Sequence, residues 1–250
     1  CSGGAALPVH VFDFFMKHDV PLLQGYGLTE SSPVITLSSE HGVKRGAVGR
    51  AIPEVEVRIA GDGEVLTRGP HVMLGYFKNQ AATEEVIRDG WLHTGDIGRL
   101  DEEGYLFITG RKKELIVTSG GKNIAPVYLE SLLTQDPLIA QAVVIGDDRK
   151  YLTALIVPEF ALLDEEIASR GLDVSSGTDV LQHTEVLKLF EERIAARLAV
   201  VSSYEQVRKF TLLKRGFTVE SGEMTPKLTL RRDSIQANCR DLIEAMYGGE

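Results

Sequence analysis

Cysteine and other metal-ligating patterns are scarce in this sequence of 250 residues. Its two cysteines, Cys1 and Cys239, stand near opposite ends of the chain and form neither a zinc-binding pair nor a redox pair. The six histidines are scattered, so a metal centre built from histidine and cysteine is not expected. Such sparing use of cysteine is typical of a reducing compartment, and we expect a cytoplasmic protein.

The sequence is also short of positive charge and of long hydrophobic runs. It has 27 basic against 36 acidic side chains, a net charge of −9, whereas a nucleic-acid-binding surface needs an excess of lysine and arginine. No apolar run approaches the roughly 18 residues of a membrane-spanning helix. The sequence opens on Cys1 without a methionine or a signal-like segment, so we expect a piece of a longer protein.

What remains is an ordinary globular composition, with 43% hydrophobic and 25% charged residues. Residues 1–110 combine helical apolar spacing with short alternating runs, one pair of which flanks a Gly-Asp-Gly turn and predicts a β-hairpin. This texture predicts a helix–strand piece followed by a small antiparallel sheet or barrel. The predicted elements are helices at 9–18 and 80–88 and strands at 21–24, 55–59, 64–68 and 104–110.

From residue 111 onward the chain alternates strands and helices and has enough apolar residues for a core of its own. We place a domain boundary at residues 111–113 and expect a small α+β domain over 111–250. Cys239 falls on the apolar face of the last helix and is expected to be a core residue. The predicted elements are strands at 115–117, 142–145 and 152–157, helices at 126–133 and 184–200, and a final helix after residue 232.

Two glycine-rich segments in residues 1–30 carry groups suited to a nucleotide. The turn at Gly3, Gly4 and Ala5 has little side chain, which lets a flat ligand approach the backbone. Around Gly27, Tyr26 offers a ring that can stack on a base, Thr29 a hydroxyl for a phosphate, and Glu30 a carboxylate for Mg²⁺. Taken singly, an ordinary turn and a capped polar turn explain these segments as well.

Charged residues in three further segments could complete such a site. Asp96 follows a glycine and could accept hydrogen bonds from two ribose hydroxyls, although a β-turn aspartate is the simpler explanation. Arg111 offers a planar fork for phosphate or sugar oxygens, with Lys113 beside it, or both belong to a solvated charged run. Lys227 stands on a polar loop, where its charge could neutralise a reacting phosphate or simply decorate a basic hairpin.

In this order, the segments resemble the adenylate-forming ligases, the superfamily of acyl-CoA synthetases, firefly-type luciferases and nonribosomal-peptide adenylation domains. The resemblance covers essentially the whole chain. Two later segments, residues 119–126 and 225–232, look most like the long-chain fatty acyl-CoA synthetase branch. The segments that carry the wider resemblance are Ser-Gly-Gly-Ala at 2–5, Gln-Gly-Tyr-Gly-Leu-Thr-Glu at 24–30, Trp-Leu-His-Thr-Gly-Asp at 91–96 and Gly-Arg-Lys-Lys-Glu-Leu-Ile at 110–116.

The resemblance implies a fatty acid–CoA ligase that uses ATP, Mg²⁺ and coenzyme A. A carboxylate attacks the α-phosphate of ATP to give an acyl-adenylate and pyrophosphate, and the thiol of coenzyme A then displaces AMP. Residues 1–110 would be the C-terminal part of a large adenylation domain, and residues 111–250 a mobile C-terminal domain. The implied roles are adenine binding by Gly3, Gly4, Ala5, Tyr26 and Gly27, α-phosphate binding by Thr29, Mg²⁺ binding by Glu30, ribose binding by Asp96 and Arg111, a hinge at Lys113, a thioester-forming loop with Gly120 and Gly121, and a catalytic Lys227.

The sequence departs from the family pattern in two ways. The family's phosphate loop would lie upstream of residue 1, so we expect the 250 residues alone to be inactive in adenylation. The usual catalytic lysine is replaced by Thr229, and Lys227 stands two positions before it. Because residues i and i+2 share a face of an extended segment, we expect Lys227 to reach a similar point.

Other functions stay open from the sequence. An adenylating enzyme could use a different acid or a carrier-protein thiol, and the chain by itself could be a non-catalytic nucleotide-binding module. We expect small-molecule substrates and no nucleic acid as partners. Acyl chain length, oligomeric state and peripheral association with the inner face of a membrane are left open.

Overall fold

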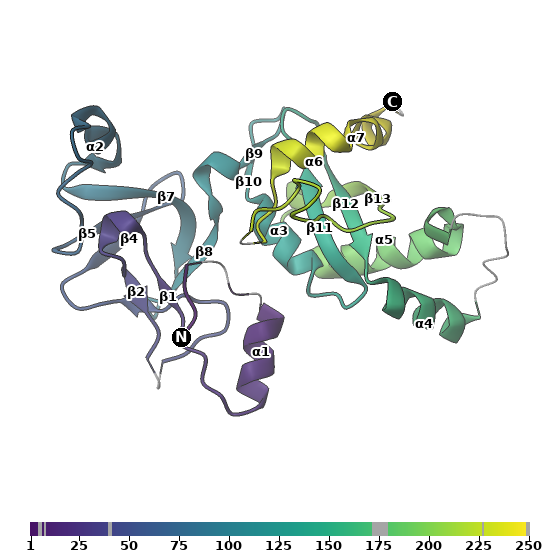
Figure 1. Cartoon of the computed structure of the whole chain (residues 1–250), viewed down its shortest axis with the longest axis horizontal. Helices are drawn as coiled ribbons and strands as arrows, with labels where there is room; N and C mark the ends of the chain where they lie inside the picture. The colour runs from purple at the N-terminus through teal and green to yellow at the C-terminus, as the bar shows by residue number, and fades with distance from the viewer. Residues whose placement is uncertain (5–6, 8, 40–41, 172–179, 227, 249–250) are drawn as a thin grey trace. The chain divides into compact units, whose positions relative to one another are not determined.

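The computed structural model describes the chain except for residues 5–6, 8, 40–41, 172–179, 227 and 249–250. The chain divides into two compact units, Cys1–Leu115 and Ile116–Glu250. In Figure 1 the first unit runs from purple to teal and the second from teal to yellow. Each unit mixes helices with strands, as the sequence predicts.

The first unit is built on two small antiparallel sheets. One has the strand order β4–β5–β7–β6 with β8 also paired to β7, and the other has the order β1–β2–β3. The elements of this unit are α1 (Val9–Lys17), β1 (Gly25–Tyr26), the 3-10 turn η1 (Thr29–Ser31), β2 (Thr36–Leu37), β3 (Arg50–Ala51), β4 (Glu56–Ile59), β5 (Glu64–Arg68), α2 (Gln80–Val86), β6 (Ile87–Arg88), β7 (Trp91–Leu100), β8 (Leu106–Arg111) and η2 (Lys112–Glu114).

The predicted hairpin around the Gly-Asp-Gly turn is confirmed as β4 and β5, whose ladder runs up to the pair Ile59 and Val65. The predicted strand at residues 21–24 is largely wrong. Only Gln24 pairs there, in an isolated bridge to Ser2, and the regular strand begins at Gly25. With a single residue opposite it, this segment has too short a partner to form a ladder.

The second unit carries a three-stranded sheet in the order β11–β12–β13, in which β11 and β12 are antiparallel and β12 and β13 are parallel. A two-stranded hairpin, β9 with β10, precedes it. The elements of this unit are β9 (Ile116–Val117), β10 (Asn123–Ile124), α3 (Pro126–Leu133), β11 (Ile139–Ile145), β12 (Leu152–Pro158), α4 (Phe160–Arg170), η3 (Val180–Gln182), α5 (Thr184–Leu198), η4 (Ser203–Glu205), β13 (Val207–Leu212), α6 (Arg232–Asn238) and α7 (Arg240–Tyr247).

Both faces of this sheet are covered, so all seven residues of β12 are buried. Alternate residues point to opposite faces of a strand. Ala154 and Ile156 therefore join a core with α3, α4 and α5, while Leu155 and Val157 join a second core with α6 and α7. Figure 1 shows α6 and α7 on one side of this sheet.

Two predictions in the C-terminal stretch need correction. The single helix expected after residue 232 is two helices, α6 and α7, which meet at Cys239, a residue buried in the second core as predicted. The extended geometry expected around residue 227 is wrong at its described neighbours. Thr225 and Leu228 close a turn through a 2.8 Å backbone hydrogen bond, and Leu228 has φ of +60°. Pro226 favours such a turn because its ring fixes φ.

Candidate functional site

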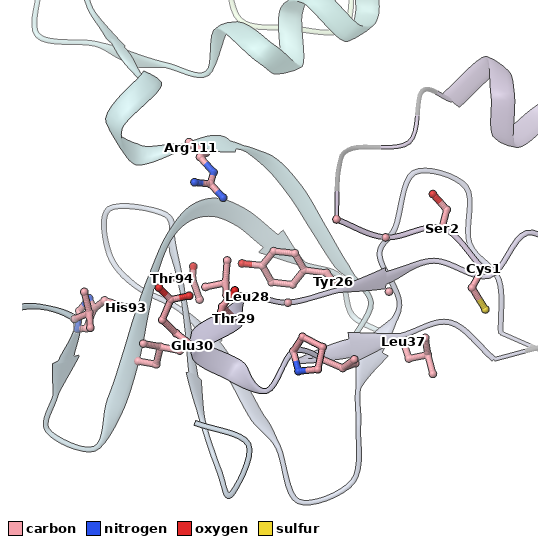
Figure 2. Close-up of a pocket in the computed structure, with 18 of the residues that line it drawn as sticks. Cys1, Ser2, Tyr26, Leu28, Thr29, Glu30, Leu37, His93, Thr94 and Arg111 are labelled. Atoms are coloured by element: carbon pink, nitrogen blue, oxygen red, sulfur yellow. The ribbon is translucent and has the colours of Figure 1, made fainter. Parts of the chain in front are cut away.

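A cavity of about 740 Å³ opens in the first unit where several chain segments meet. Figure 2 shows its lining, with the Tyr26 ring and Thr29 near the centre and Arg111 above them. Predicted site residues that line it are Gly3, Gly4, Tyr26, Gly27, Thr29, Glu30 and Arg111, with Cys1, Ser2, Gly25, Leu28, Pro33, Val34, Leu37, Tyr76, Val86, Leu92, His93 and Thr94 beside them.

Backbone pairing explains why the two glycine-rich segments share this cavity. The Ser2 N–H donates to Leu23 O at 2.7 Å, and the Gly25 N–H donates back to Ser2 O at 3.0 Å. Gly27 is required by close packing, since an added Cβ would lie 1.9 Å from the Pro33 carbonyl oxygen. The glycine thus lets the backbone next to Tyr26 pack directly against the backbone at Pro33 and Ile35.

Three residues distant in sequence form one hydrogen-bonded group beside the cavity. The Tyr26 hydroxyl donates to Asp96 Oδ2 at 2.7 Å, and Arg111 Nε lies 3.0 Å from Asp96 Oδ1. Asp96 and Arg111 are direct partners in the ladder between β7 and β8. The sheet register therefore brings together two side chains that the sequence places in separate segments.

Asp96 is buried, with 3% of its surface exposed. Burial raises the pKa of its carboxyl, while the Tyr26 hydrogen bond and the charge of Arg111 partly oppose that rise. Burial and the nearby Asp96 charge also raise the pKa of Tyr26, so its hydroxyl stays protonated and remains a donor. Asp96 is not itself among the lining residues, but its partners Tyr26 and Arg111 are, and each carboxylate oxygen can accept a further hydrogen bond besides the one it has.

Thr29 and Glu30 begin the short turn η1 at the cavity wall. Ser31, fully buried, fixes this turn because its hydroxyl donates to Leu28 O at 2.9 Å and accepts from Leu28 N at 2.8 Å. Glu30 Oε1 accepts a hydrogen bond from the Tyr76 hydroxyl at 2.8 Å. A hydroxyl and a carboxylate thus lie at neighbouring positions of one rigid turn.

Glu64, which hydrogen-bonds to the chain neighbours of Asp96 and Arg111, has no local signal in the sequence. Its carboxylate is buried and accepts from Gly95 N at 3.0 Å and from Lys112 Nζ at 2.9 Å, and His93 Nδ1 lies 3.0 Å from it. Glu64 is the first residue of an alternating strand and reads there as an ordinary exposed position. Only the pairing of β5 with β7 reveals its partners.

Several predicted site residues are not brought to this cavity by the first unit. Lys113 lies exposed in η2 and is not among the lining residues. Gly120 and Gly121 belong to the second unit, in a turn where Gly121 N donates to Thr118 O at 2.8 Å. Ala5 and Lys227 lie outside the described residues.

Comparison with known families accounts for both units. Residues 1–77 match the model of the AMP-binding enzymes, and residues 113–250 match the AMP-binding enzyme C-terminal domain. The chain belongs to the AMP-binding enzyme family. The predicted membership in the adenylate-forming superfamily is thereby confirmed.

The AMP-binding relatives include fatty acid–CoA ligases. The chain is 40% identical over 251 residues to long-chain-fatty-acid–CoA ligase FadD15 of Mycobacterium bovis, covering 100% of the chain and 42% of that relative. It is 32% identical to long-chain-fatty-acid–CoA ligase ACSBG1 of Rattus norvegicus, covering 98% of the chain and 37% of that relative. The chain therefore spans less than half the length of either protein.

A solved AMP-binding enzyme shares the fold. O-succinylbenzoate coenzyme A synthetase (MenE) of Bacillus subtilis, in complex with ATP and a magnesium ion, is 28% identical and superposes with a TM-score of 0.65. The match covers 92% of this chain and 44% of that one. The predicted fold, the C-terminal part of an adenylation domain followed by a smaller C-terminal domain, is confirmed.

Proposed function

We propose that the chain is the C-terminal part of a long-chain fatty acid–CoA ligase, which joins a fatty acid to coenzyme A with cleavage of ATP to AMP and pyrophosphate. The observation that carries the proposal is the group formed by Tyr26, Asp96 and Arg111 beside the turn that holds Thr29 and Glu30. The 40% identity to a relative named as such a ligase supports the choice of acid.

The nucleotide half of the site follows from the cavity lining. Gly3, Gly4 and Gly27 line the cavity, adenine would lie against their backbone, and Tyr26 would present its ring to the base. Asp96 would accept hydrogen bonds from the ribose hydroxyls, with Arg111 holding the carboxylate and offering its remaining N–H groups to sugar or phosphate oxygens. Ala5, which lies outside the described residues, stays a proposed adenine-binding residue.

The phosphate half of the site rests on Thr29 and Glu30. The Thr29 hydroxyl would donate to the α-phosphate, whose negative charge grows during attack. The Glu30 carboxylate suits Mg²⁺, which usually takes one or two protein carboxylates together with substrate phosphates. Consistent with such a sparse ligand set, no cluster of three or more His, Cys, Asp or Glu side chains occurs among the residues that the structure describes. Mg²⁺ would neutralise phosphate charge during pyrophosphate release.

The second unit would serve both half-reactions. In adenylation the fatty acid carboxylate attacks the α-phosphorus and pyrophosphate leaves, and the Lys227 ammonium would stabilise the developing charge. In thioester formation the coenzyme A thiol attacks the acyl carbonyl and AMP leaves, with the loop of Gly120 and Gly121 turned to the site. Lys113, in η2 close to the unit boundary, would be the hinge.

The 250 residues alone are proposed to be inactive, because the family's phosphate loop has no counterpart among them.

The described residues contain no helix long and apolar enough to cross a membrane. Both cysteines are free, in keeping with the cytoplasmic location that we propose.

The test is fatty-acid-dependent exchange between ATP and pyrophosphate by the complete protein, across short to long acids, with and without coenzyme A. Exchange that responds to long acids, followed by thioester once coenzyme A is added, is the expected result. Exchange without thioester would favour a carrier-protein thiol as acceptor. Exchange with other acids only would show that the substrate is not a long-chain fatty acid. No exchange with any acid would overturn the proposal in favour of a nucleotide-binding module.

Lys227→Ala tests the role of the displaced lysine in the same assay. Exchange should fall by about a hundredfold or more, because an electrostatic partner of the transition state is removed. Lys214→Ala, also in the second unit, is the matched control for loss of one positive charge and should leave exchange within about twofold. Unchanged exchange by Lys227→Ala would reject the assignment.

A further inference from the structure

We propose that Glu64 is a positioning residue for ribose recognition, holding Asp96 and Arg111 at the separation that the nucleotide requires. The inference rests on the proposed function, since it takes these two residues as the ribose-binding pair. Glu64 does not line the cavity and would touch no substrate.

The pairing of β5 with β7 contains a bulge directly beside Glu64 and Asp96. Glu64 is opposite Ile97 and Leu66 is opposite His93, so one residue on β5 faces three on β7. The three are Thr94, Gly95 and Asp96. Bulges bend a strand locally and re-aim its side chains, and they recur beside active sites.

Within the bulge, the side chain of Glu64 replaces a strand-to-strand backbone hydrogen bond. Its Oε1 accepts from Gly95 N at 3.0 Å, and Gly95 has φ of +71°, a conformation that suits glycine. The Thr94 hydroxyl closes the other side by donating to Val65 O at 2.7 Å and accepting from Asp96 N at 3.1 Å. The backbone on the N-terminal side of Asp96 is thus fixed by side chains instead of the sheet.

The second oxygen of Glu64 reaches the other half of the pair. Lys112, directly after Arg111, lies with Nζ 2.9 Å from Glu64 Oε2 and 2.7 Å from Asp62 Oδ2. His93 Nδ1 approaches the same oxygen at 3.0 Å. One buried carboxylate therefore accepts hydrogen bonds from both Gly95, the residue before Asp96, and Lys112, the residue after Arg111.

The charge of Glu64 is maintained by these partners. Burial opposes ionisation, but the hydrogen bonds from His93 and Lys112 outweigh it and lower the pKa of the carboxyl. A buried carboxylate is tolerated only when its oxygens are paired in this way. A neutral side chain of the same shape could not satisfy both donors.

The experiment compares ribose discrimination in the complete protein. Binding of ATP and of 2′,3′-dideoxy-ATP is measured by calorimetry for the wild type, Glu64→Gln and Glu56→Gln. Glu56 is the matched control, since it lies on the same hairpin and pairs with Arg68 at the surface. Glu64→Gln should weaken ATP about tenfold while leaving dideoxy-ATP almost unchanged, because a misplaced pair loses only its hydroxyl contacts. Glu56→Gln should change neither.

Equal weakening of both nucleotides by Glu64→Gln would show a merely structural role, and unchanged ATP binding would show none. Either result overturns the inference. If Glu64→Gln does not fold, Lys112→Met is the deciding variant. Lys112 is half-exposed, and its replacement removes only the ion pair that joins Glu64 to the residue after Arg111. An ATP-specific loss with that variant supports the inference, and no loss overturns it. A wild type that prefers ATP over dideoxy-ATP but exchanges with no acid would sink the proposed function and leave this inference standing.

Discussion

The two units divide the work of the chain differently. In the second unit, apolar side chains fill both faces of one sheet, and β12 is buried along its whole length. In the first unit, two small sheets place polar groups in the interior, among them Glu64 and Asp96, and a large open cavity lies at their edge. The second unit also buries carboxylates, namely Glu130, Asp136 and Glu223, so the two units differ in the amount of apolar packing around such groups, which is larger in the second unit.

The largest expected effect comes from separating the units after Leu115. Residues 116–250 should unfold cooperatively on their own, because both apolar cores of the sheet lie within them. Residues 1–115 should show a weaker and broader transition, since they bury less apolar surface. Thermal and urea unfolding followed by circular dichroism measures both. A sharper transition for residues 1–115 would reverse the comparison.

An intermediate effect is expected from Glu223→Gln in the second unit. Glu223 is fully buried and accepts from Arg215 at 2.7 and 2.9 Å and from Asn238 at 3.0 Å. The Arg215 hydrogen bonds, against the effect of burial, lower the pKa of this carboxyl from 4.5 to about 2. Because the folded pKa is the lower one, this stabilisation is present above pH 4.5 and is lost as pH falls towards 2.

Glu223→Gln should therefore cost about 2 kcal/mol of unfolding free energy near neutral pH, and the deficit should shrink in acid. Urea unfolding of the second unit at a series of pH values provides the measurement. Glu220→Gln, on an exposed carboxyl of the same loop, is the control and should behave like the wild type. A deficit that is independent of pH would point to packing instead of charge.

The smallest effect, of opposite sign, is expected from Asp96→Asn in the first unit. Burial raises the pKa of Asp96, so the folded unit loses stability as pH rises from the ordinary aspartate pKa through the raised one. Asparagine does not ionise and should raise the unfolding midpoint slightly near neutral pH, while nucleotide affinity falls. Trp91, the single tryptophan of the chain, reports on this unit by fluorescence.

Asp101→Asn is the control. Lys44 lowers the pKa of Asp101, so loss of this carboxylate charge should destabilise the same unit. If both variants shifted the fluorescence midpoint downward, the buried charge of Asp96 would not be a cost to the fold.

Much of this organisation could be predicted from the sequence. The helix at Pro126–Leu133 and the hairpin of β4 and β5 follow from local rules, namely a proline that opens a helix and glycines that close a turn. The residues proposed to bind the nucleotide can be singled out in the sequence because each lies in a short segment of unusual composition. Their assignment to a site is carried by proximity, which only the fold supplies.

What the sequence could not predict depends on pairing between distant segments. Glu64 has no local signal, because its role comes from a register shift in a ladder with β7. The break between α6 and α7 at Cys239 is also invisible in the apolar spacing, which continues across it. The turn at Thr225 and Leu228 was missed because alternating polar and apolar residues fit a strand equally well.

The two-sided sheet of the second unit also has a consequence for how the protein is made. Val143, Ile145, Leu155 and Val157 leave the ribosome well before α6 and α7, which cover them. Until those last helices are synthesised, one face of the sheet presents bare apolar surface to its surroundings, the kind of surface that chaperones bind. A messenger RNA truncated before α6 would yield a chain that aggregates through this exposed apolar face. Such a chain would be degraded before its loss of activity had any effect.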